Sequence, residues 1–353
     1  MPRSANNTIY ILREWIKVYK LDFEHLSKNP NAINLLQTKL SANEKINWQT
    51  LCLNPNAIRL LEYKILEESK LSNTELNKKN IYDRIDWSYL SSNPNAIHLL
   101  EKQIEKETKL TATQISKIKF SYKIDWSRLS ANPNAMYLLK ENTGQIVWDD
   151  FVTNENLDLE LLKIQIEKER NGEESGGNTI TPRKLWKNPN TKLITFLLKL
   201  YPLSINWQTI CENTNSIAIK KIKNQIKKKL NDWSVLSENP KAIEILTANP
   251  NIIHWWYLSS NPKAISLLEK RVFDEANSKN KYNTIANKID WNRLSANPNA
   301  IHLLKANPDK IDVSYLCSNP NAISLLRERI DTFTSENWKT FSMNPCIFKK
   351  TTI

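Results

Sequence analysis

Proton transfer, metal binding and nucleophilic attack need histidines, carboxylates or cysteines at spacings that bring them together, and this chain has four histidines and four cysteines. His25, His98, His254 and His302 are scattered, and none forms a recurring arrangement with a cysteine or carboxylate. The sequence also contains no nucleophile elbow, kinase motif or metalloprotease helix. We therefore expect surface or capping histidines and a protein that is not an enzyme and uses no cofactor.

A recurring acidic position could hold a general acid or base. Aspartate occupies it at Asp86, Asp125, Asp232, Asp290 and Asp312, and asparagine replaces it at Asn47, Asn206 and Asn337. An amide cannot exchange a proton as a catalytic acid does, but both side chains accept hydrogen bonds from backbone N–H groups at a helix start. The position is therefore interpreted as a helix cap.

The cysteines also follow a recurring position. Cys52, Cys211 and Cys317 stand where other copies of the same segment have serine. Equivalent positions in different repeats lie at least one repeat apart, so these cysteines should neither pair nor share a metal. We expect these three cysteines to be small buried residues in a reducing compartment. Cys346 does not share their position in the repeat.

One repeated segment supplies the elements that position these residues. The stretch "IDWSYLSSNPNAIHLL" (Ile85 to Leu100) returns in similar form from Ile124 and from Ile289. An Asn-Pro pair marks ten clear copies, at Pro30, Pro55, Pro94, Pro133, Pro189, Pro240, Pro262, Pro298, Pro320 and Pro345. Two degenerate copies stand at Asn154–Asn156 and Asn213–Asn215. The chain therefore carries about twelve repeats of 22–39 residues.

Each repeat predicts two helices. Asp86 caps a short first helix, and Asn93 with Pro94 is predicted to be the N-cap and first residue of a second one. Alanine, isoleucine and leucine follow at helical spacing. We therefore predict an all-α protein, an α-solenoid of short helix-turn-helix repeats.

Nine of the twelve tryptophans share one register of the repeat, namely Trp48, Trp87, Trp126, Trp148, Trp207, Trp233, Trp255, Trp291 and Trp338. A ladder of rings in the core would give this pattern, and so would a stacking platform for bases. The apolar residue on the same helix face favours the core.

The chain is expected to have one array with two special segments. Residues 1–20 predict an N-terminal capping helix, because "TIYILREWIKVYKLD" (Thr8 to Asp22) is amphipathic, and 21–353 predict the array. A flexible loop is expected near 171–178, where three of the four glycines lie. Charged extensions with sparse apolar positions, predicted as surface helices or hairpins, occupy 62–84, 101–123, 163–180 and 269–288.

Two features could bind a partner. One is a variable position in the second helix, at Asn34, Arg59, His98, Tyr137, Glu244, Ser266, His302 and Ser324, which is either unconstrained or selects partner proteins. The other is a lysine-rich segment, with Lys220, Lys221, Lys223, Lys227, Lys228 and Lys229, which is either a solvated face or a surface for nucleic acid or an acidic protein. The net charge of +13 favours acidic partners, although Asn, Lys and Ile also share A/T-rich codons.

The pattern W-x-x-L-S-x-N-P-N-A-I-x-L-L resembles repeat proteins of giant nucleocytoplasmic DNA viruses of the mimivirus-like group. It lies at Trp87–Leu100, Trp126–Leu139 and Trp291–Leu304. The resemblance implies a viral protein in the host cytoplasm, the viral factory or the virion, and supplies no catalytic residue.

We expect a non-enzymatic protein-protein interaction scaffold whose partners are other proteins. The alternative is a nucleic-acid-binding repeat protein that uses the lysine-rich surface. No apolar run is long enough to span a membrane and no signal peptide is recognised, so no membrane partner is expected. No small-molecule substrate is expected of a non-enzymatic scaffold.

Overall fold

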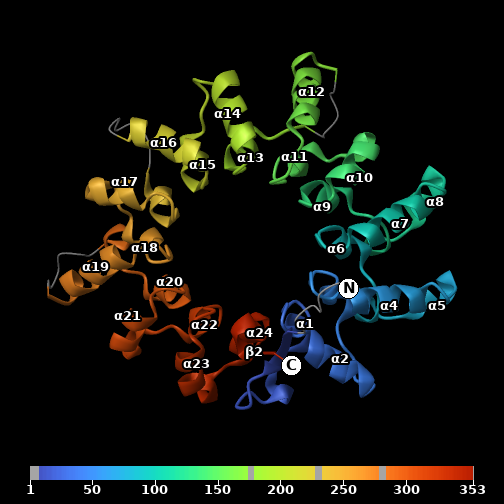
Figure 1. Ribbon diagram of the computed structural model, residues 1–353, viewed down its shortest axis with the longest axis horizontal. Coiled ribbons are helices and arrows are strands. Elements are labelled where there is room, and N and C mark those ends of the chain that lie inside the picture. Colours follow the sequence, from blue (N-terminus) through green and yellow to red (C-terminus); the bar gives the residue numbers. More distant parts are fainter. Residues whose placement is uncertain (1–7, 174–178, 227–232, 278–283, 353) are drawn as a thin grey trace, which may run out of the picture. The chain divides into compact units, whose positions relative to one another are not determined.

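The computed structural model describes residues 8–173, 179–226, 233–277 and 284–352. These residues form 24 α-helices, ten 3-10 helices and two strands, so the prediction of a mostly helical protein is confirmed (Figure 1). The chain divides into two compact units, unit 1 (Met1–Asp150 and Ile330–Ile353) and unit 2 (Phe151–Arg329).

Unit 1 contains the first ten repeat helices, the last one and both strands. Its elements are β1 (Thr8–Leu12), η1 (Val18–Lys20), α1 (Phe23–Leu26), α2 (Ile33–Ser41), α3 (Trp48–Leu51), α4 (Ile58–Glu68), α5 (Asn73–Lys78), η2 (Ile81–Asp83), α6 (Trp87–Ser91), α7 (Ile97–Glu107), α8 (Ala112–Lys117), η3 (Phe120–Tyr122), α9 (Trp126–Ala131), α10 (Met136–Glu141), η4 (Thr143–Gln145), η9 (Ile330–Thr332), α24 (Ser335–Met343), η10 (Pro345–Ile347) and β2 (Phe348–Thr352). Helix α11 (Trp148–Phe151) ends one residue past the unit boundary.

Unit 2 repeats the same alternation of helices. Its elements are α12 (Leu159–Arg170), α13 (Pro182–Lys187), α14 (Thr191–Leu200), α15 (Trp207–Glu212), α16 (Ser216–Gln225), η5 (Ser234–Glu238), α17 (Ile243–Ala248), η6 (Pro250–Ile252), α18 (Trp255–Leu258), α19 (Ile265–Asn277), η7 (Ile285–Asn287), α20 (Trp291–Ala296), α21 (Ile301–Ala306), η8 (Pro308–Lys310), α22 (Val313–Leu316) and α23 (Ile323–Arg329).

The recurring acidic position caps the first helix of the repeat. Asp86 Oδ1 accepts the N–H of Tyr89 at 2.9 Å, and Asn47 Oδ1 accepts the N–H of Thr50 at 2.9 Å. The same bond caps α1, α9, α15, α20 and α22. Asn337 departs from the prediction, because it is the third residue of α24 and shares a capping box with Thr334. Asp232 lies outside the described residues.

The Asn-Pro-Asn-Ala segment is a turn, and the prediction that its first asparagine caps the second helix is wrong. The carbonyl of Asn93 accepts the N–H of Ala96 at 3.2 Å, and α7 begins only at Ile97. Asn93 Oδ1 accepts the N–H of Asn95 at 3.0 Å. Proline at the second position and an asparagine oxygen that binds two residues ahead are both typical of such turns. The amide nitrogen of Asn93 is thereby left for another partner.

That amide nitrogen joins successive repeats. Asn93 Nδ2 donates to the carbonyls of Cys52 at 2.9 Å and Asn54 at 3.1 Å, both in the preceding repeat. The second asparagine adds a third bond, from Asn95 Nδ2 to the Pro55 carbonyl at 2.9 Å. The pair of hydrogen bonds from the Nδ2 of the first asparagine recurs at Asn54, Asn132, Asn188, Asn213, Asn239, Asn261, Asn297 and Asn319. These asparagines are buried, so their bonds satisfy carbonyls that no water reaches.

The serine position makes a further bond between repeats. Ser91 Oγ donates to the Trp87 carbonyl at 2.8 Å and accepts the N–H of Asp125, in the next repeat, at 3.1 Å. In the cysteine version, Cys52 Sγ donates to the Trp48 carbonyl at 3.3 Å. Cys52, Cys211 and Cys317 are fully buried and form no disulfide, as predicted. The cysteine therefore replaces the serine hydroxyl in a structural role.

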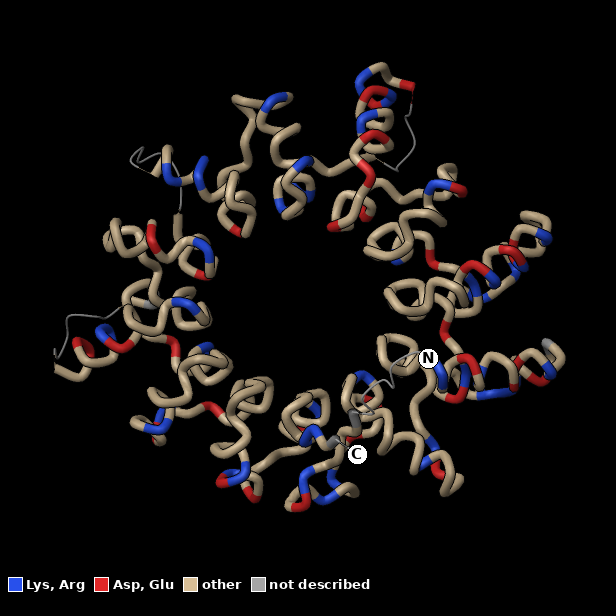
Figure 2. Tube along the Cα trace, in the orientation of Figure 1, with Lys and Arg blue, Asp and Glu red and all other residues tan. Residues whose placement is uncertain are grey.

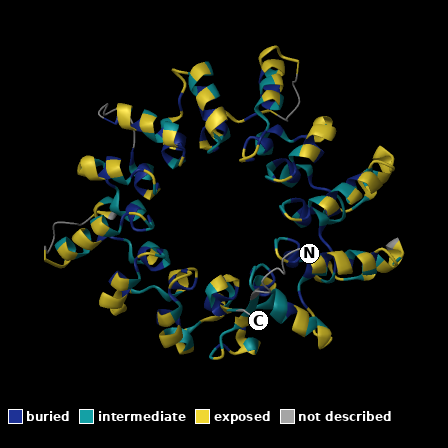
Figure 3. Cartoon of the chain, in the orientation of Figure 1, coloured by how far each residue is buried: buried dark blue, intermediate teal, exposed yellow. Residues whose placement is uncertain are grey.

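Leucine and alanine fill the core more completely than tryptophan does. Leu90, Ala96 and Leu100 are fully buried, as are their counterparts in most other repeats. Among the nine tryptophans of the shared register, Trp48, Trp148 and Trp233 are buried and the other six are half-buried. Cations cover some of these rings, such as Lys64 Nζ at 5.0 Å from the ring centroid of Trp48. Burial is highest at the turns and short first helices (Figure 3).

The N-terminal segment forms a strand, so the predicted capping helix over residues 1–20 is wrong for its described part. β1 pairs antiparallel with β2, with Ile9 opposite Thr351. Asn29 makes the same pair of hydrogen bonds here, because its Nδ2 donates to the carbonyls of Ser342 at 2.9 Å and Asn344 at 3.1 Å. Within unit 1, the first repeat therefore stacks on the last as neighbouring repeats do.

The charged residues gather on the second helices and on the extensions (Figure 2). The short first helices of successive repeats instead pack on each other, for example α6 on α9 and α20 on α22. No helix in the described part of the chain is both long enough and apolar enough to cross a membrane. The surface available to a partner is therefore carried mainly by the second helices and by the extensions.

Candidate functional site

The long repeats carry hairpin-like extensions, as predicted. After α4, the chain turns into α5 and returns through η2; after α7, it turns into α8 and returns through η3. Both added helices begin with a capping box, Ser72 with Glu75 and Thr111 with Gln114. The two extensions therefore have the same construction although few of their residues are identical.

A glutamate near the end of each long helix anchors the returning chain. Glu68 Oε1 accepts the N–H of Ile85 at 3.1 Å, and Glu107 Oε1 accepts the N–H of Ile124 at 3.0 Å. The other two extensions use the same bond, from Ile180 to Glu169 and from Ile289 to Glu275. Burial raises the pKa of Glu68, Glu107 and Glu275. Sequence reasoning missed this anchor, although all four extensions carry the glutamate.

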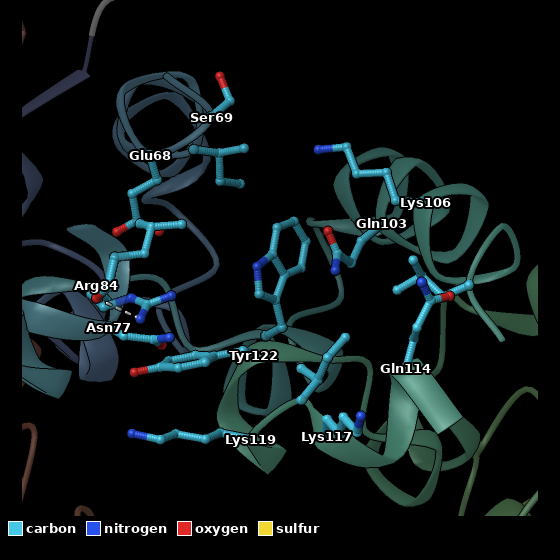
Figure 4. A pocket seen from close by; sticks show the side chains of 15 residues that line it. Glu68, Ser69, Asn77, Arg84, Gln103, Lys106, Gln114, Lys117, Lys119 and Tyr122 are labelled. Carbon is cyan, nitrogen blue, oxygen red and sulfur yellow. Dashed lines mark hydrogen bonds between the residues drawn. The ribbon is translucent and has the colours of Figure 1, made fainter. Parts of the chain in front are cut away.

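A groove of about 650 Å³ separates the first two extensions (Figure 4). Helices α4 and α5 form one wall, α7, α8 and η3 form the other, and Trp87 lies between them in sequence. The apolar lining comes from Ile65, Leu76, Leu110 and Ile118, and the amide lining from Asn77, Gln103 and Gln114. The groove can therefore hold a ligand with both apolar and polar groups.

Arg84 is a buried cation in the wall of this groove. Its side chain is only 6% exposed, Nη1 donates to the Leu76 carbonyl at 2.7 Å, and Cζ lies 3.5 Å from the centroid of the Tyr122 ring. Its Nε has no hydrogen-bond partner, and Arg84 forms no ion pair with any described carboxylate. The charge of Arg84 acts on Glu68, whose pKa it lowers against the effect of burial, but the two groups form no ion pair. A carboxylate or other anion in the groove would add a direct ion pair to this buried guanidinium.

Three lysines add positive charge to the opposite wall. Lys106, Lys117 and Lys119 are exposed, and none forms an ion pair with the described residues. Figure 4 shows the ring of Tyr122 between Arg84 and Lys119, whose Nζ lies 5.9 Å from the ring centroid. The lining has one acidic residue, Glu68, which already accepts a backbone N–H. The groove is therefore a positively charged site.

The variable position of the second helix does not converge on this groove. Seven of its eight residues are exposed, Asn34 is half-buried, and none lines the groove; the seven are Arg59, His98, Tyr137, Glu244, Ser266, His302 and Ser324. His98 Nε2 lies 2.8 Å from Glu62 Oε1, and His302 Nε2 lies 2.7 Å from Glu269 Oε1. Burial and a hydrogen bond with Glu101 raise the pKa of Tyr137. At these three places the position bridges to the preceding repeat.

The lysine-rich segment is described only in part. Lys220 and Lys223 are exposed on α16, and Lys221 is half-buried. Lys227, Lys228 and Lys229 lie outside the described residues, as does 174–178 of the loop expected near 171–178. The structure therefore shows two exposed lysines one helical turn apart on α16.

Exposed apolar side chains gather on the extensions. Eight of the fourteen large apolar residues that the described surface exposes lie there, at Tyr63, Leu66, Ile81, Tyr82, Leu110, Phe120, Ile164 and Phe273. Six of the eight lie in 62–84 and 101–123, the two extensions that form the groove, and Leu110 lines it. Apolar residues concentrated in this way are typical of protein interaction sites.

The described part of the chain gives no support to metal binding, or to thiol chemistry at Cys52 or Cys346. No group of three His, Cys, Asp or Glu side chains suited to a metal ion occurs among the residues that the structure describes. Burial raises the pKa of the Cys52 thiol, and it raises the pKa of Cys346 to about 11. No protein-family model, curated protein or solved structure matches the chain.

Proposed function

We propose that this protein is a non-enzymatic scaffold, an α-solenoid of about twelve repeats, that binds other proteins through its extensions. The observation that supports this most strongly is the gathering of exposed apolar side chains on the extensions. Leaving such residues in water is unfavourable, and covering them with a partner recovers the free energy of burial.

The polar residues of the repeat support a structural role for the rest of the array. The asparagine amides, the serine hydroxyls and the capping aspartates are each engaged in bonds within or between repeats, as at Asn93, Ser91 and Asp86. Side chains that hold backbone groups in this way are not free to bind and turn over a substrate.

The resemblance of the repeat to viral repeat proteins supports a proposal about location. We propose that the scaffold acts in the host cytoplasm or viral factory, or inside the particle. Immunofluorescence of infected cells and immunoblotting of purified particles would test this location. Signal confined to other compartments of the cell, such as the secretory pathway, would contradict it.

Affinity purification tests the scaffold. Tagged protein is recovered from the producing cells with and without nuclease, at low and high salt, and its partners are re-tested with purified components. Defined proteins that remain after nuclease and high salt, and that then bind the purified chain directly, would support the proposal. Recovery that depends on nucleic acid would contradict it.

Nucleic acid is the second candidate partner, because Lys220 and Lys223 are exposed on one face of α16. Under this alternative, Lys220→Glu with Lys223→Glu lowers the affinity for a labelled oligonucleotide and reduces the salt dependence of binding. Lys263→Glu with Lys305→Glu reverses the same number of charges elsewhere in unit 2 and is the control. Equal effects of the two pairs would reject a specific surface on α16.

A further inference from the structure

We propose that the groove between the first two extensions binds an acidic peptide segment of the partner protein. This inference rests on the proposed scaffold function and specifies the chemistry of one of its sites. The groove combines an apolar lining with four cations, Arg84, Lys106, Lys117 and Lys119, against the single carboxylate of Glu68.

The charge arrangement selects a carboxylate-bearing ligand. The guanidinium of Arg84 is buried and forms no ion pair with a described carboxylate. Glu68 attracts it at longer range, while its Oε1 accepts the N–H of Ile85. A ligand carboxylate that reaches this cation would add a direct, charge-assisted hydrogen bond, for which the Nε of Arg84 has no partner. The exposed lysines on the other wall can pair with further carboxylates along the same segment.

The apolar lining selects a peptide over a nucleic acid strand. Leu76, Leu110 and Ile118 offer a place for an apolar side chain, which the sugar-phosphate backbone of a nucleic acid does not supply. Base stacking needs an open aromatic face, and the cations of Arg84 and Lys119 approach both faces of the Tyr122 ring. Only Trp87 is left as an aromatic ring in the lining. An acidic segment that carries a central leucine matches both properties.

The amides in the lining suit the backbone of such a segment. Asn77 and Gln114 are exposed on opposite walls and each carries both a donor and an acceptor. Gln114 Oε1 accepts the N–H of Thr111 in the capping box, which leaves its Nε2 for a peptide carbonyl. Backbone recognition of this kind sets the direction of the peptide without requiring one sequence.

Titration with a defined probe tests the groove. The probe is a fluorescein-labelled, amidated Glu-Glu-Leu-Glu-Glu peptide, and binding to the full chain is followed by fluorescence anisotropy. We expect Lys106→Glu with Lys117→Glu to weaken binding roughly tenfold or more, since two ion pairs become repulsive contacts. Lys102→Glu with Lys109→Glu changes the same charge in the same extension without touching the lining, and should have less than about a twofold effect.

The outcomes distinguish failure of the groove proposal from failure of the scaffold proposal. Equal weakening by both pairs, or tighter binding of an oligothymidylate of equal charge at the same lysines, would overturn the groove proposal. Circular dichroism checks that both variants stay folded. If protein partners bind the Lys106→Glu, Lys117→Glu variant as tightly as they bind the original chain, the groove proposal fails and the scaffold stands. If the probe binds as expected but no protein partner is found, the scaffold fails.

Discussion

At the scale of single residues, the first asparagine of each repeat combines two tasks that different atoms of one amide perform. Its Oδ1 closes the turn of its own repeat, and its Nδ2 donates to two carbonyls of the preceding repeat, as at Asn93. Aspartate has no donor for the second task, and alanine has neither group. The constancy of this asparagine along the chain therefore follows from hydrogen bonding between repeats.

Substitution of Asn93 tests this account. Asn93→Ala removes three hydrogen bonds and leaves the buried Cys52 carbonyl unpaired, whereas the Asn54 carbonyl keeps the N–H of Ala57. We therefore expect a loss of about 2–4 kcal/mol in the free energy of unfolding. Asn93→Asp should cost more, because a buried carboxylate would face two carbonyl oxygens. Asn95→Ala removes one exposed bond and should cost about 0.5–1.5 kcal/mol. Urea unfolding measures all three.

If Asn93→Ala lowers the free energy of unfolding no more than Asn95→Ala does, the proposed role of Asn93 between repeats is contradicted.

The sequence predicts the position of this asparagine but not its task. An asparagine before proline satisfies the rules for a helix N-cap and for a turn equally well. The difference lies in which N–H reaches Oδ1, and that depends on where the second helix can pack.

At the scale of elements, the extensions depend on a glutamate that binds backbone. The extra helices could be predicted from their charge and their capping boxes, since both are local in sequence. The anchor could not, because Glu107 and Ile124 are 17 residues apart and only the fold brings them together. The groove also escaped prediction, although two consecutive 39-residue spacings, from Pro55 to Pro94 to Pro133, place two extensions side by side.

The pH dependence of stability tests the anchor. Burial raises the pKa of Glu107, so the native state holds its proton to a higher pH than the unfolded chain does. Between the ordinary value and the raised pKa, the free energy of unfolding therefore falls as pH rises. Glu107→Gln can keep an acceptor for the Ile124 N–H without the charge, and should remove this fall.

Thermal unfolding of both proteins from pH 4 to pH 7 measures the effect. We expect Glu107→Gln to gain stability relative to the original chain as pH rises. Glu105→Gln removes an exposed carboxylate from the same helix and is the control. A difference between Glu107→Gln and the original chain that stays constant over this range would show that the charge of Glu107 is not linked to folding.

At the scale of the whole chain, the two ends are joined within unit 1. Strands β1 and β2 pair, and Arg13 Nε donates to the Cys346 carbonyl at 2.8 Å across 333 residues of sequence. The amphipathic pattern of residues 8–22 predicts a helix. This prediction is wrong because β1 pairs with the most distant segment of the chain, which the local pattern cannot reveal. Long-range pairing of this kind overrides local propensity.

Phe348→Ala tests the joined ends. Phe348 is buried opposite Leu12, and its truncation should cost about 3–5 kcal/mol locally. We expect faster amide hydrogen exchange in Thr8–Leu12 and unchanged exchange in the turns of unit 2. Lys350→Ala, two residues on and exposed, is the control. Unchanged exchange in Thr8–Leu12 would show that the pairing contributes little.

Site-specific crosslinking tests the central claim, that partners bind the extensions and not the repeat stack. A photoreactive phenylalanine analogue replaces Tyr82 or Phe120 in the extensions, or Leu203 outside them, which is 97% exposed. After irradiation in the producing cells, the account predicts defined protein adducts at Tyr82 and Phe120 and none above background at Leu203. Adducts that form equally at all three positions, or only at Leu203, would contradict it.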